Sequence, residues 1–227
     1  MDKLDIELFV FDQKKKVVNK DIKGSIYIAL NLFTLSYFEE FFRAHINSII
    51  FWCDGIMGKI HLSNRGIKTS KVPGPTFLKQ ILNKIKNDVI IIGNMDDIES
   101  KFLSSRNINV IFNHKLVNYK YKDLKLLNFH EDAEIIITLP SPLQEEAAFY
   151  LHQKFPNNNF FCVGGALKMV TYPELEAPKL IRNIGLEWLY RFKTDPIRRL
   201  KRISKSFFKY LKNFKQISKY KWRLLIE

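Results

Sequence analysis

Seven short apolar runs, rich in Ile, Val and Phe, recur along the chain and are separated by longer segments of helical character. The runs are Ile6–Phe11, Ser25–Leu30, Ser48–Cys53, Asp88–Gly93, Ile108–Phe112, Glu134–Leu139 and Asn159–Val163. Continuous apolar runs of this length are typical of strands that are buried on both faces. Because strands that alternate with helices form right-handed βαβ units, the pattern predicts an α/β fold with a mainly parallel sheet and helices on both faces.

Apolar residues at spacings of three and four predict the intervening helices. These helices are expected in Leu35–Ile46, Phe77–Ile85 and Leu143–Phe155. The segment His61–Thr76 contains two Gly and two Pro and shows no periodicity, so it is predicted to be a mobile loop.

Most of the excess positive charge lies in one segment. The chain has a formal net charge of +14; residues 179–227 contain 15 Lys and Arg against three Asp and Glu, whereas residues 1–178 contain 22 against 20. Within this basic segment, Asp195-Pro196 has the pattern of an N-cap followed by proline in the first turn of a helix. We therefore expect an α/β body over residues 1–178 and a basic, amphipathic helical appendage over residues 179–227.

Composition excludes several other classes of protein. A hydrophobic content of 46% excludes a mainly disordered chain. The two cysteines, Cys53 and Cys162, each follow apolar residues and are expected to be buried, which indicates a reducing compartment. The charged N-terminus argues against a secretory signal, and no apolar stretch is long enough to span a bilayer. We therefore expect a cytoplasmic protein that meets a membrane at its surface.

Small or polar residues follow several of the predicted strands. Asn31, Asp54 and Gly164-Gly165 are in such positions, and so is the segment Pro140–Glu145. Ligands of open parallel sheets bind outside the carboxyl ends of the strands, so these residues predict one cleft along a sheet edge. Asp54 follows five apolar residues and could act as a general base, but it could equally serve as the N-cap of the next helix.

Several common chemical motifs are absent from the sequence. There is no GxGxxG, no GxxxxGK[ST], no HExxH and no GxSxG. Binding of a nucleotide by a Walker loop, a transition-metal site and serine hydrolase chemistry are therefore disfavoured. We expect neither a metal ion nor an organic cofactor.

The basic appendage is open to three interpretations. It could be an ordinary solvated surface, it could hold nucleic acid through phosphates, or it could lie on an anionic membrane. The predicted helix has an apolar face that includes Phe207, Leu211 and Phe214. Membrane binding uses such a face and phosphate binding does not, so we favour the membrane. The same face could instead form a contact between subunits, and an oligomer is compatible with it.

One block of sequence points to a known family. Residues 185–192 read GLEWLYRF and precede Asp195-Pro196 and an arginine cluster. Here the chain resembles the WecG/TagA/CpsF glycosyltransferases (glycosyltransferase family 26), whose members characteristically read GLEWLYRL before a Pro and an Arg cluster. Less specific blocks keep the family's order from Asn31 to Arg202, namely Asp54-Gly55-Ile56, Val72–Thr76, Leu139–Glu145 and Gly164-Gly165-Ala166.

The resemblance implies a Rossmann-like fold and metal-independent sugar transfer with inversion. The donor would be a UDP-sugar, commonly of the N-acetylmannosamine type, and the acceptor a polyprenyl-diphosphate-linked sugar of cell-envelope or capsule polysaccharide synthesis. The resemblance assigns Asp54 as the base. Asn31 and Gln144 would orient the donor, and Arg191 and Arg198 would close over the diphosphate. The remaining substrate-binding positions would be Gly74, Glu145, Gly164, Gly165 and Lys201.

In this interpretation the basic appendage covers the site and holds the enzyme on the inner face of the cytoplasmic membrane. Some positions depart from the family pattern. Ala29, Ser141, Lys168, Glu176 and Lys201 stand where the family usually has Thr, Gly or Ala, Asp, Arg and Arg. These departures leave two alternatives open, an inactive relative that serves as a membrane-docked scaffold and a basic nucleic-acid-binding protein. Nucleic acid ranks last, because residues 1–178 are nearly neutral.

Overall fold

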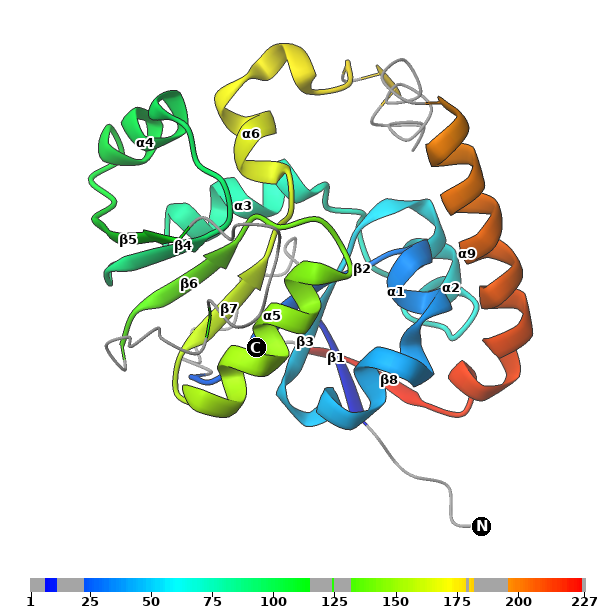
Figure 1. Ribbon diagram of the computed structural model, residues 1–227. Coiled ribbons are helices and arrows are strands. Elements are labelled where there is room, and N and C mark those ends of the chain that lie inside the picture. The colour runs from blue at the N-terminus through cyan, green and yellow to red at the C-terminus, as the bar shows by residue number, and fades with distance from the viewer. Residues whose placement is uncertain are drawn as a thin grey trace.

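The structure is a computed structural model that describes residues 7–11, 23–114, 124, 132–178, 180–181 and 196–225. Within this part of the chain, eight strands form one twisted sheet in the order β5-β4-β6-β7-β2-β3-β1-β8 (Figure 1). The strands are β1 (Glu7–Phe11), β2 (Ile26–Leu30), β3 (Ile49–Cys53), β4 (Val89–Ile92), β5 (Val110–His114), β6 (Glu134–Ile137), β7 (Asn159–Cys162) and β8 (Lys221–Leu225). Every described pair of neighbouring strands is parallel.

Helices pack on both faces of this sheet, which confirms the predicted α/β fold. One face is covered by α1 (Leu32–Ser36), a π-helix η1 (Phe38–Phe42), a 3-10 helix η2 (Arg43–Ser48), α2 (Gly55–Ser63), α5 (Leu143–Lys154) and α9 (Pro196–Ile217). The other face is covered by α3 (Gly74–Leu82), α4 (Asp97–Ser104) and α6 (Ala166–Thr171), and a short 3-10 helix η5 (Pro173–Leu175) follows.

Six of the seven predicted runs contain a whole strand, and the seventh, Ile108–Phe112, overlaps β5, which continues to His114. Where side chains of these strands are described, most are buried between the two helical layers. In β3, for example, all five residues are buried. Alternate residues pack into opposite layers, so that Phe51 contributes to the layer of α1 and α5, and Trp52 stacks on Phe77 of α3 with ring centroids 3.9 Å apart. Cys53 and Cys162 are both buried, as predicted.

Two sequence predictions of local structure were wrong. The helix expected over Leu35–Ile46 is divided into α1, η1 and η2. The loop expected over His61–Thr76 is shorter, because α2 continues to Ser63 and α3 begins at Gly74. His61 remains helical because it is fully buried against α9.

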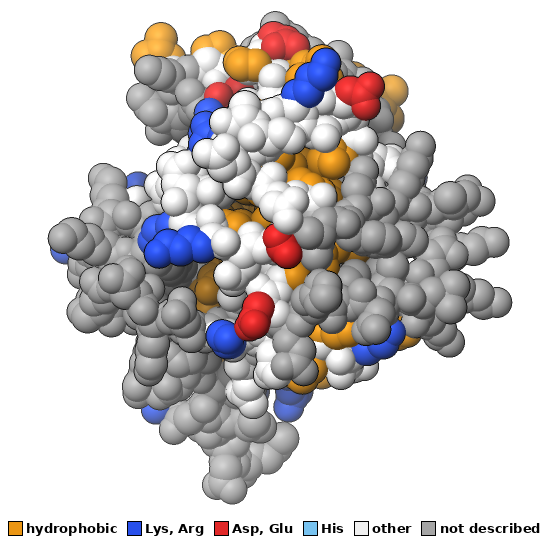
Figure 2. Space-filling view, turned by 90° about the vertical axis from the view of Figure 1, so that its left-hand side faces the viewer, with side chains coloured by type: hydrophobic (Ala, Val, Ile, Leu, Met, Phe, Trp, Pro, Cys, Tyr) orange, Lys and Arg blue, Asp and Glu red, His pale blue; other side chains and the backbone are white. Residues whose placement is uncertain are grey.

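Charge is unevenly distributed over the described surface. On the face in Figure 2, which is the left-hand side of Figure 1 around α4 and β5, basic and acidic side chains are interspersed, with hydrophobic side chains between them. Helix α9, at the right of Figure 1, contains eight Lys and Arg and no acidic residue. The structure therefore carries a concentrated positive charge along α9.

The C-terminal segment is joined to the sheet by its last strand. β8 pairs with β1, with Leu8 opposite Trp222. β8 is therefore the edge strand of the sheet, and β1 lies between β8 and β3. Tyr220 and Trp222 pack on Phe38, with ring centroids 5.0 and 5.9 Å apart. The segment expected to be helical thus ends in a strand. The division into a body (1–178) and an appendage (179–227) stays a prediction, although β8 belongs to the sheet of the body.

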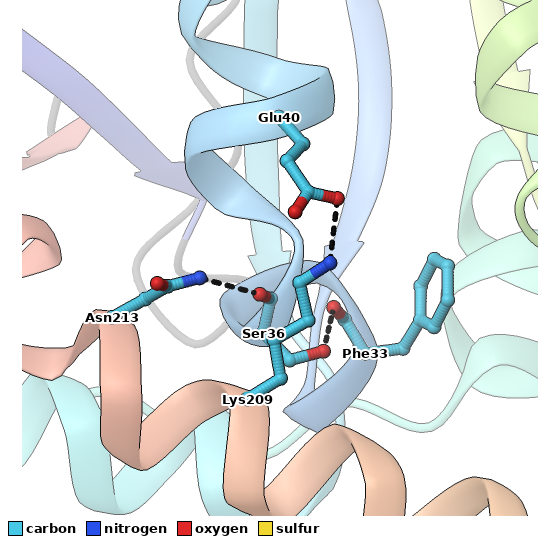
Figure 3. Close-up of polar contacts among 5 residues, drawn as sticks. All are labelled: Phe33, Ser36, Glu40, Lys209 and Asn213. Atoms are coloured by element: carbon cyan, nitrogen blue, oxygen red, sulfur yellow. Dashed lines mark hydrogen bonds and ion pairs between the residues drawn. The ribbon is translucent and has the colours of Figure 1, made fainter.

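Helix α9 docks where α1 changes into η1 (Figure 3). The amide of Glu40 donates to the carbonyl of Tyr37 instead of that of Ser36, which leaves the Ser36 carbonyl without an intrahelical donor. Asn213 of α9 donates its Nδ2 hydrogen to this carbonyl at 3.1 Å. Lys209, one turn earlier, forms an ion pair with Glu40. The irregular helix therefore supplies the polar groups that hold α9.

Buried polar groups hold α9 to α2 as well. His61 Nδ1 lies 3.1 Å from the Tyr210 hydroxyl, and Trp222 packs edge-on against the imidazole. Arg65 donates to the carbonyl of His61 and to the Ser218 hydroxyl. Burial, together with the nearby charge of Arg65, lowers the pKa of His61 to about 3. The imidazole is therefore neutral in the folded protein at neutral pH.

We predict that mild acid weakens the fold through His61. The unfolded chain binds a proton at an ordinary histidine pKa of 6.5, whereas the folded chain resists it down to about 3. The free energy of unfolding should therefore fall as the pH drops below 6.5, by about 2 kcal/mol at pH 5. Urea unfolding of the wild type and of His61→Gln at pH 7.5 and 5.0 measures this loss.

The difference in pH dependence between the wild type and His61→Gln measures the contribution of the His61 imidazole. Burial raises the pKa of Glu145, so that its carboxyl acts in the opposite direction, but it does so equally in both proteins. Equal pH dependence of the wild type and the variant would contradict the prediction.

Candidate functional site

A cleft of about 530 Å³ lies at the carboxyl ends of three neighbouring strands, β7, β2 and β3. Its floor and walls come from the residues that follow these strands, from the start of α3, from the two residues after η5, and from α9. Of the predicted site residues, the cleft contains Asn31, Asp54, Gly74 and Gly165. The position agrees with the rule that open parallel sheets bind ligands at the carboxyl ends of their strands.

Asn31 is held rigidly at the edge of the cleft because it caps α1. Its Oδ1 accepts hydrogen bonds from the amides of Phe33 and Thr34, at 2.9 and 3.2 Å. The Thr34 hydroxyl accepts in turn from the Asn31 amide, which completes a capping box. With Oδ1 occupied in this way, the Nδ2 amino group remains to donate hydrogen bonds to a ligand.

Asp54 stands at the N-terminus of α2 and lines the cleft, half-buried. The sequence left open whether this carboxylate caps the helix or does chemistry. The residue occupies the N-cap position, but its side chain makes no capping hydrogen bond to α2. The next residue, Gly55, has a φ of +75°, a conformation that glycine adopts easily. The turn therefore brings the carboxylate to the cleft without using it as a helix cap.

Gly58 places α2 against the strand that carries Asn31. A Cβ added to Gly58 would lie 2.1 Å from the carbonyl oxygen of Leu30, at the end of β2. The absence of a side chain thus allows α2 and β2 to approach, and with them the two polar residues Asp54 and Asn31.

A second cavity, of about 400 Å³, adjoins the cleft at Gly165, which lines both. Gly164 also lines this cavity and has a φ of +53°. The remaining lining residues come from the carboxyl ends of β4 and β6 and from α4 and α6: Asn94, Met95, Asp96, Glu99, Thr138, Leu167 and Lys168. A ligand that lay across Gly165 would therefore reach both cavities.

Gln144 and Glu145 are buried behind the cleft and do not line it. Gln144 donates its Nε2 hydrogens to the Ser141 hydroxyl and to Glu145 Oε1, both at 2.8 Å. Ser141 also donates to Glu145 Oε1 at 2.8 Å. Burial raises the pKa of Glu145, and the hydrogen bonds from Gln144 and Ser141 oppose that rise. A Cβ on Gly164 would be 3.5 Å from Gln144 Oε1, so this network supports the glycine turn from behind.

The appendage contributes one wall of the cleft, and it does so with an arginine that sequence reasoning did not single out. Arg202, Ile203, Ser206 and Phe207 of α9 line the cleft. The Arg202 guanidinium lies over the ring of Phe33, 5.3 Å from its centroid, and its charge opposes in small part the rise that burial causes in the pKa of Glu145. The available signal was helical spacing, since Arg202 lies one turn after Arg198.

The other predicted cations are placed differently. Lys201 is exposed and lies outside the cleft. Arg191 and the side chain of Arg198 lie outside the part of the chain that the structure describes. Glu176, which stands where the family usually has Arg, does line the cleft, and Ala29 is buried in the sheet beside it. The departure at Glu176 therefore changes the charge of the site itself.

Together the sheet and the cleft define an α/β protein with a cleft at the carboxyl ends of its strands, one wall of which is formed by the basic helix α9. A model of the glycosyl transferase WecG/TagA/CpsF family matches residues 2–223, and the chain belongs to that family. It is thus a glycosyltransferase of a family that makes cell-envelope polymers, and membership implies a sugar donor and a lipid-linked acceptor.

Two features were considered in the part of the chain that the structure describes, a membrane-spanning helix and a metal-binding cluster of side chains. None of the described helices has the length and apolar character needed to cross a membrane. Among the same residues, no group of three or more His, Cys, Asp or Glu side chains is arranged to hold a metal ion.

We predict that Gly58→Ala destabilises the protein by about 2 kcal/mol or more, because the new methyl group cannot fit against the Leu30 carbonyl without moving α2 or β2. Gly74→Ala is the matched control, since its Cβ would make an ordinary 3.5 Å contact with Ala166. Urea unfolding measures both. A Gly58→Ala protein as stable as Gly74→Ala would show that the close approach is not required.

Proposed function

We propose that this protein transfers a sugar from a UDP-sugar to a polyprenyl-diphosphate-linked acceptor, with inversion at the anomeric carbon and without a metal ion. The observation that carries the proposal is that Asp54 and Arg202 line the same cleft. Asp54 supplies a carboxylate at a strand end, and Arg202 supplies a cation from α9. A sugar of the N-acetylmannosamine type is the donor group we favour. The polymer would be a cell-envelope or capsule polysaccharide.

In this mechanism Asp54 accepts the proton of the acceptor hydroxyl. The hydroxyl oxygen attacks the anomeric carbon of the donor from the side opposite the diphosphate. As the new carbon–oxygen bond forms, the bond from the anomeric carbon to the diphosphate oxygen breaks, and UDP leaves with the electron pair. A single displacement of this kind inverts the anomeric centre. A carboxylate positioned as a general base contributes about 10²- to 10⁴-fold to such a step.

Arg202 would stabilise the charge that develops on the departing diphosphate. A guanidinium can donate two parallel hydrogen bonds to phosphate oxygens, and it is held here over Phe33. The Nδ2 group of Asn31 would donate to the donor sugar. Gly164 and Gly165 lie where the two cavities meet, so we place the diphosphate along them, with the nucleotide in the smaller cavity. Gln144 and Glu145 would support this glycine turn from behind.

The surface of α9 supports a position on the membrane. Six large apolar side chains of this helix are exposed: Ile197, Leu200, Phe207, Phe208, Leu211 and Phe214. The exposed lysines Lys201, Lys205, Lys212 and Lys215 accompany them. An anionic leaflet attracts each nearby lysine by about 1 kcal/mol, and the most exposed apolar side chains, such as Ile197 and Phe208, can enter the interface. We therefore propose that the enzyme works on the inner face of the cytoplasmic membrane.

Asp54→Asn should lower the rate of transfer at least a hundredfold while leaving the fold unchanged, because the amide cannot accept the proton. The assay is UDP release with a panel of UDP-sugars and a polyprenyl-diphosphate-linked acceptor. Asp97→Asn, an exposed acidic residue on α4 outside both cavities, should keep full activity. An Asp54→Asn enzyme that turned over normally would remove Asp54 from the role of base.

Arg202→Ala should lower kcat/KM by about 10- to 100-fold, the cost of losing hydrogen bonds to a charged group. The neighbouring substitution Lys201→Ala should lower it less than threefold, because Lys201 is exposed and lies outside the cleft. The same UDP-release assay compares the two. A larger effect at Lys201 than at Arg202 would contradict our assignment of the diphosphate-binding cation.

A further inference from the structure

A strip of exposed apolar side chains runs along the seam between α2 and α9. Ile56 and Ile60 lie one helical turn apart on α2, and Phe207, Leu211 and Phe214 follow one another at spacings of four and three on α9. Their exposed fractions lie between 38% and 53%, so each side chain is partly sheltered and partly open. We call these five residues the α2–α9 strip. An apolar strip of this kind on a soluble surface usually marks a binding site.

The two helices lie side by side and run in the same direction. His61 of α2 meets Tyr210 of α9, and Arg65, just after α2, lies with its guanidinium 5.8 Å from the ring centroid of Phe214. Residues toward the C-terminal end of α2 thus contact residues toward the C-terminal end of α9, so the two helices are parallel. The interval from Phe207 to Phe214 corresponds to about 10 Å along the helix axis. The strip is therefore an elongated surface that leads away from the cleft.

The strip begins inside the cleft. Ile56 and Phe207 line the cleft and are also exposed at 43% and 42%, so they belong to both surfaces. Met57 and Ile203 extend the apolar wall inward, toward Asp54 and Arg202. A molecule with a charged head and a hydrocarbon chain could thus place its head in the cleft and its chain along the strip.

We propose that the α2–α9 strip binds the first isoprenoid units of the acceptor lipid and guides the chain from the cleft to the bilayer. This inference rests on the proposed function, because it takes the acceptor to be a polyprenyl diphosphate. The diphosphate of the acceptor lies at the mouth of the cleft, its first isoprene unit covers Ile56 and Phe207, and the next unit covers Ile60. More distal units pass Leu211 and Phe214 and enter the membrane.

The geometry of α9 separates this strip from the surface that would enter a bilayer. Phe208 is 70% exposed and, at the helical spacing of 100° per residue, points away from Phe207 and from α2. A side chain that protrudes in this way suits insertion among lipids. The half-sheltered strip beside α2 suits a single hydrocarbon chain. Phe208 therefore provides a matched control on the same helix.

Direct binding of short prenyl diphosphates tests the proposal without any sugar. Farnesyl diphosphate, with 15 carbons, should bind the full-length protein at least tenfold more tightly than isopentenyl diphosphate, with five, because the longer chain buries more apolar surface. Calorimetric titration in detergent-free buffer, below the concentration at which the lipid forms micelles, measures both. Equal affinity for the two compounds would overturn the proposal.

Substitutions locate the effect. Ile60→Gln and Leu211→Gln, both outside the cleft lining, should remove most of the advantage of the longer chain while leaving isopentenyl diphosphate binding unchanged. Phe208→Gln should keep that advantage and instead weaken sedimentation with anionic phospholipid vesicles. A Phe208→Gln protein that lost the chain-length dependence as fully as Ile60→Gln would show that the strip is not the prenyl site.

These results are distinguishable from failure of the proposed function. Chain-length-dependent binding that Ile60→Gln removes would uphold the strip even in a protein that transfers no sugar. Transfer at equal kcat/KM to acceptors with 5 and 15 carbons would retain the function and overturn the strip.

Discussion

The parallel pairing of β8 with β1 is the constraint on which the rest of the site depends. Only a few residues separate the end of α9 at Ile217 from the start of β8 at Lys221, so the strand fixes the end of the helix. Tyr220 and Trp222 secure that strand by packing on Phe38 in the core. With one end held, α9 lies along α1 and α2, and its first half reaches the cleft with Arg202.

The same arrangement gives the reacting groups a common support. Asn31 is the cap of α1, and Asp54 stands at the start of α2. Both helices are held by α9, one through the Ser36 carbonyl and the other through His61. A displacement of α9 would therefore disturb the polar donor, the proposed base and the cation together. Precise placement of groups that develop or neutralise charge is what such chemistry requires.

The sequence was sufficient for seven strands of the sheet and insufficient for the last strand and for the helical layer that closes the cleft. The seven strands could be recognised because each lies in a run of apolar residues, the pattern typical of strands buried on both faces. β8 was missed because it lies in a segment that is otherwise basic and helical. The alternation of Lys221 and Arg223 with apolar residues is too short there to stand out as a strand. The helix expected over Leu35–Ile46 is divided into three short helices, and its Phe38 packs against Trp222 of β8, a contact that periodicity does not contain.

The sequence predicted the cleft residues that directly follow a strand. It did not predict the residues whose orientation depends on a tertiary contact. Asn31, Asp54 and Gly165 lie in the cleft because the ends of parallel strands share one edge. Which cation of α9 faces the cleft depends on the rotation of the helix, and burial of Tyr210 and Ile217 sets that rotation. Gln144 belongs to a recognisable motif, yet its side chain is directed to Ser141 and Glu145 behind the cleft.

The pairing of Leu8 with Trp222 also affects how the protein can be made. Contacts between residues so far apart in sequence form late, because the entropy of closing a long loop must be overcome first. On the ribosome, β1 would remain an open sheet edge, and the cleft would lack its arginine, until the segment that contains Trp222 had emerged. Assembly of a competent site is thereby tied to the synthesis of β8, and a chain that stopped before β8 would expose a strand edge that is prone to aggregation.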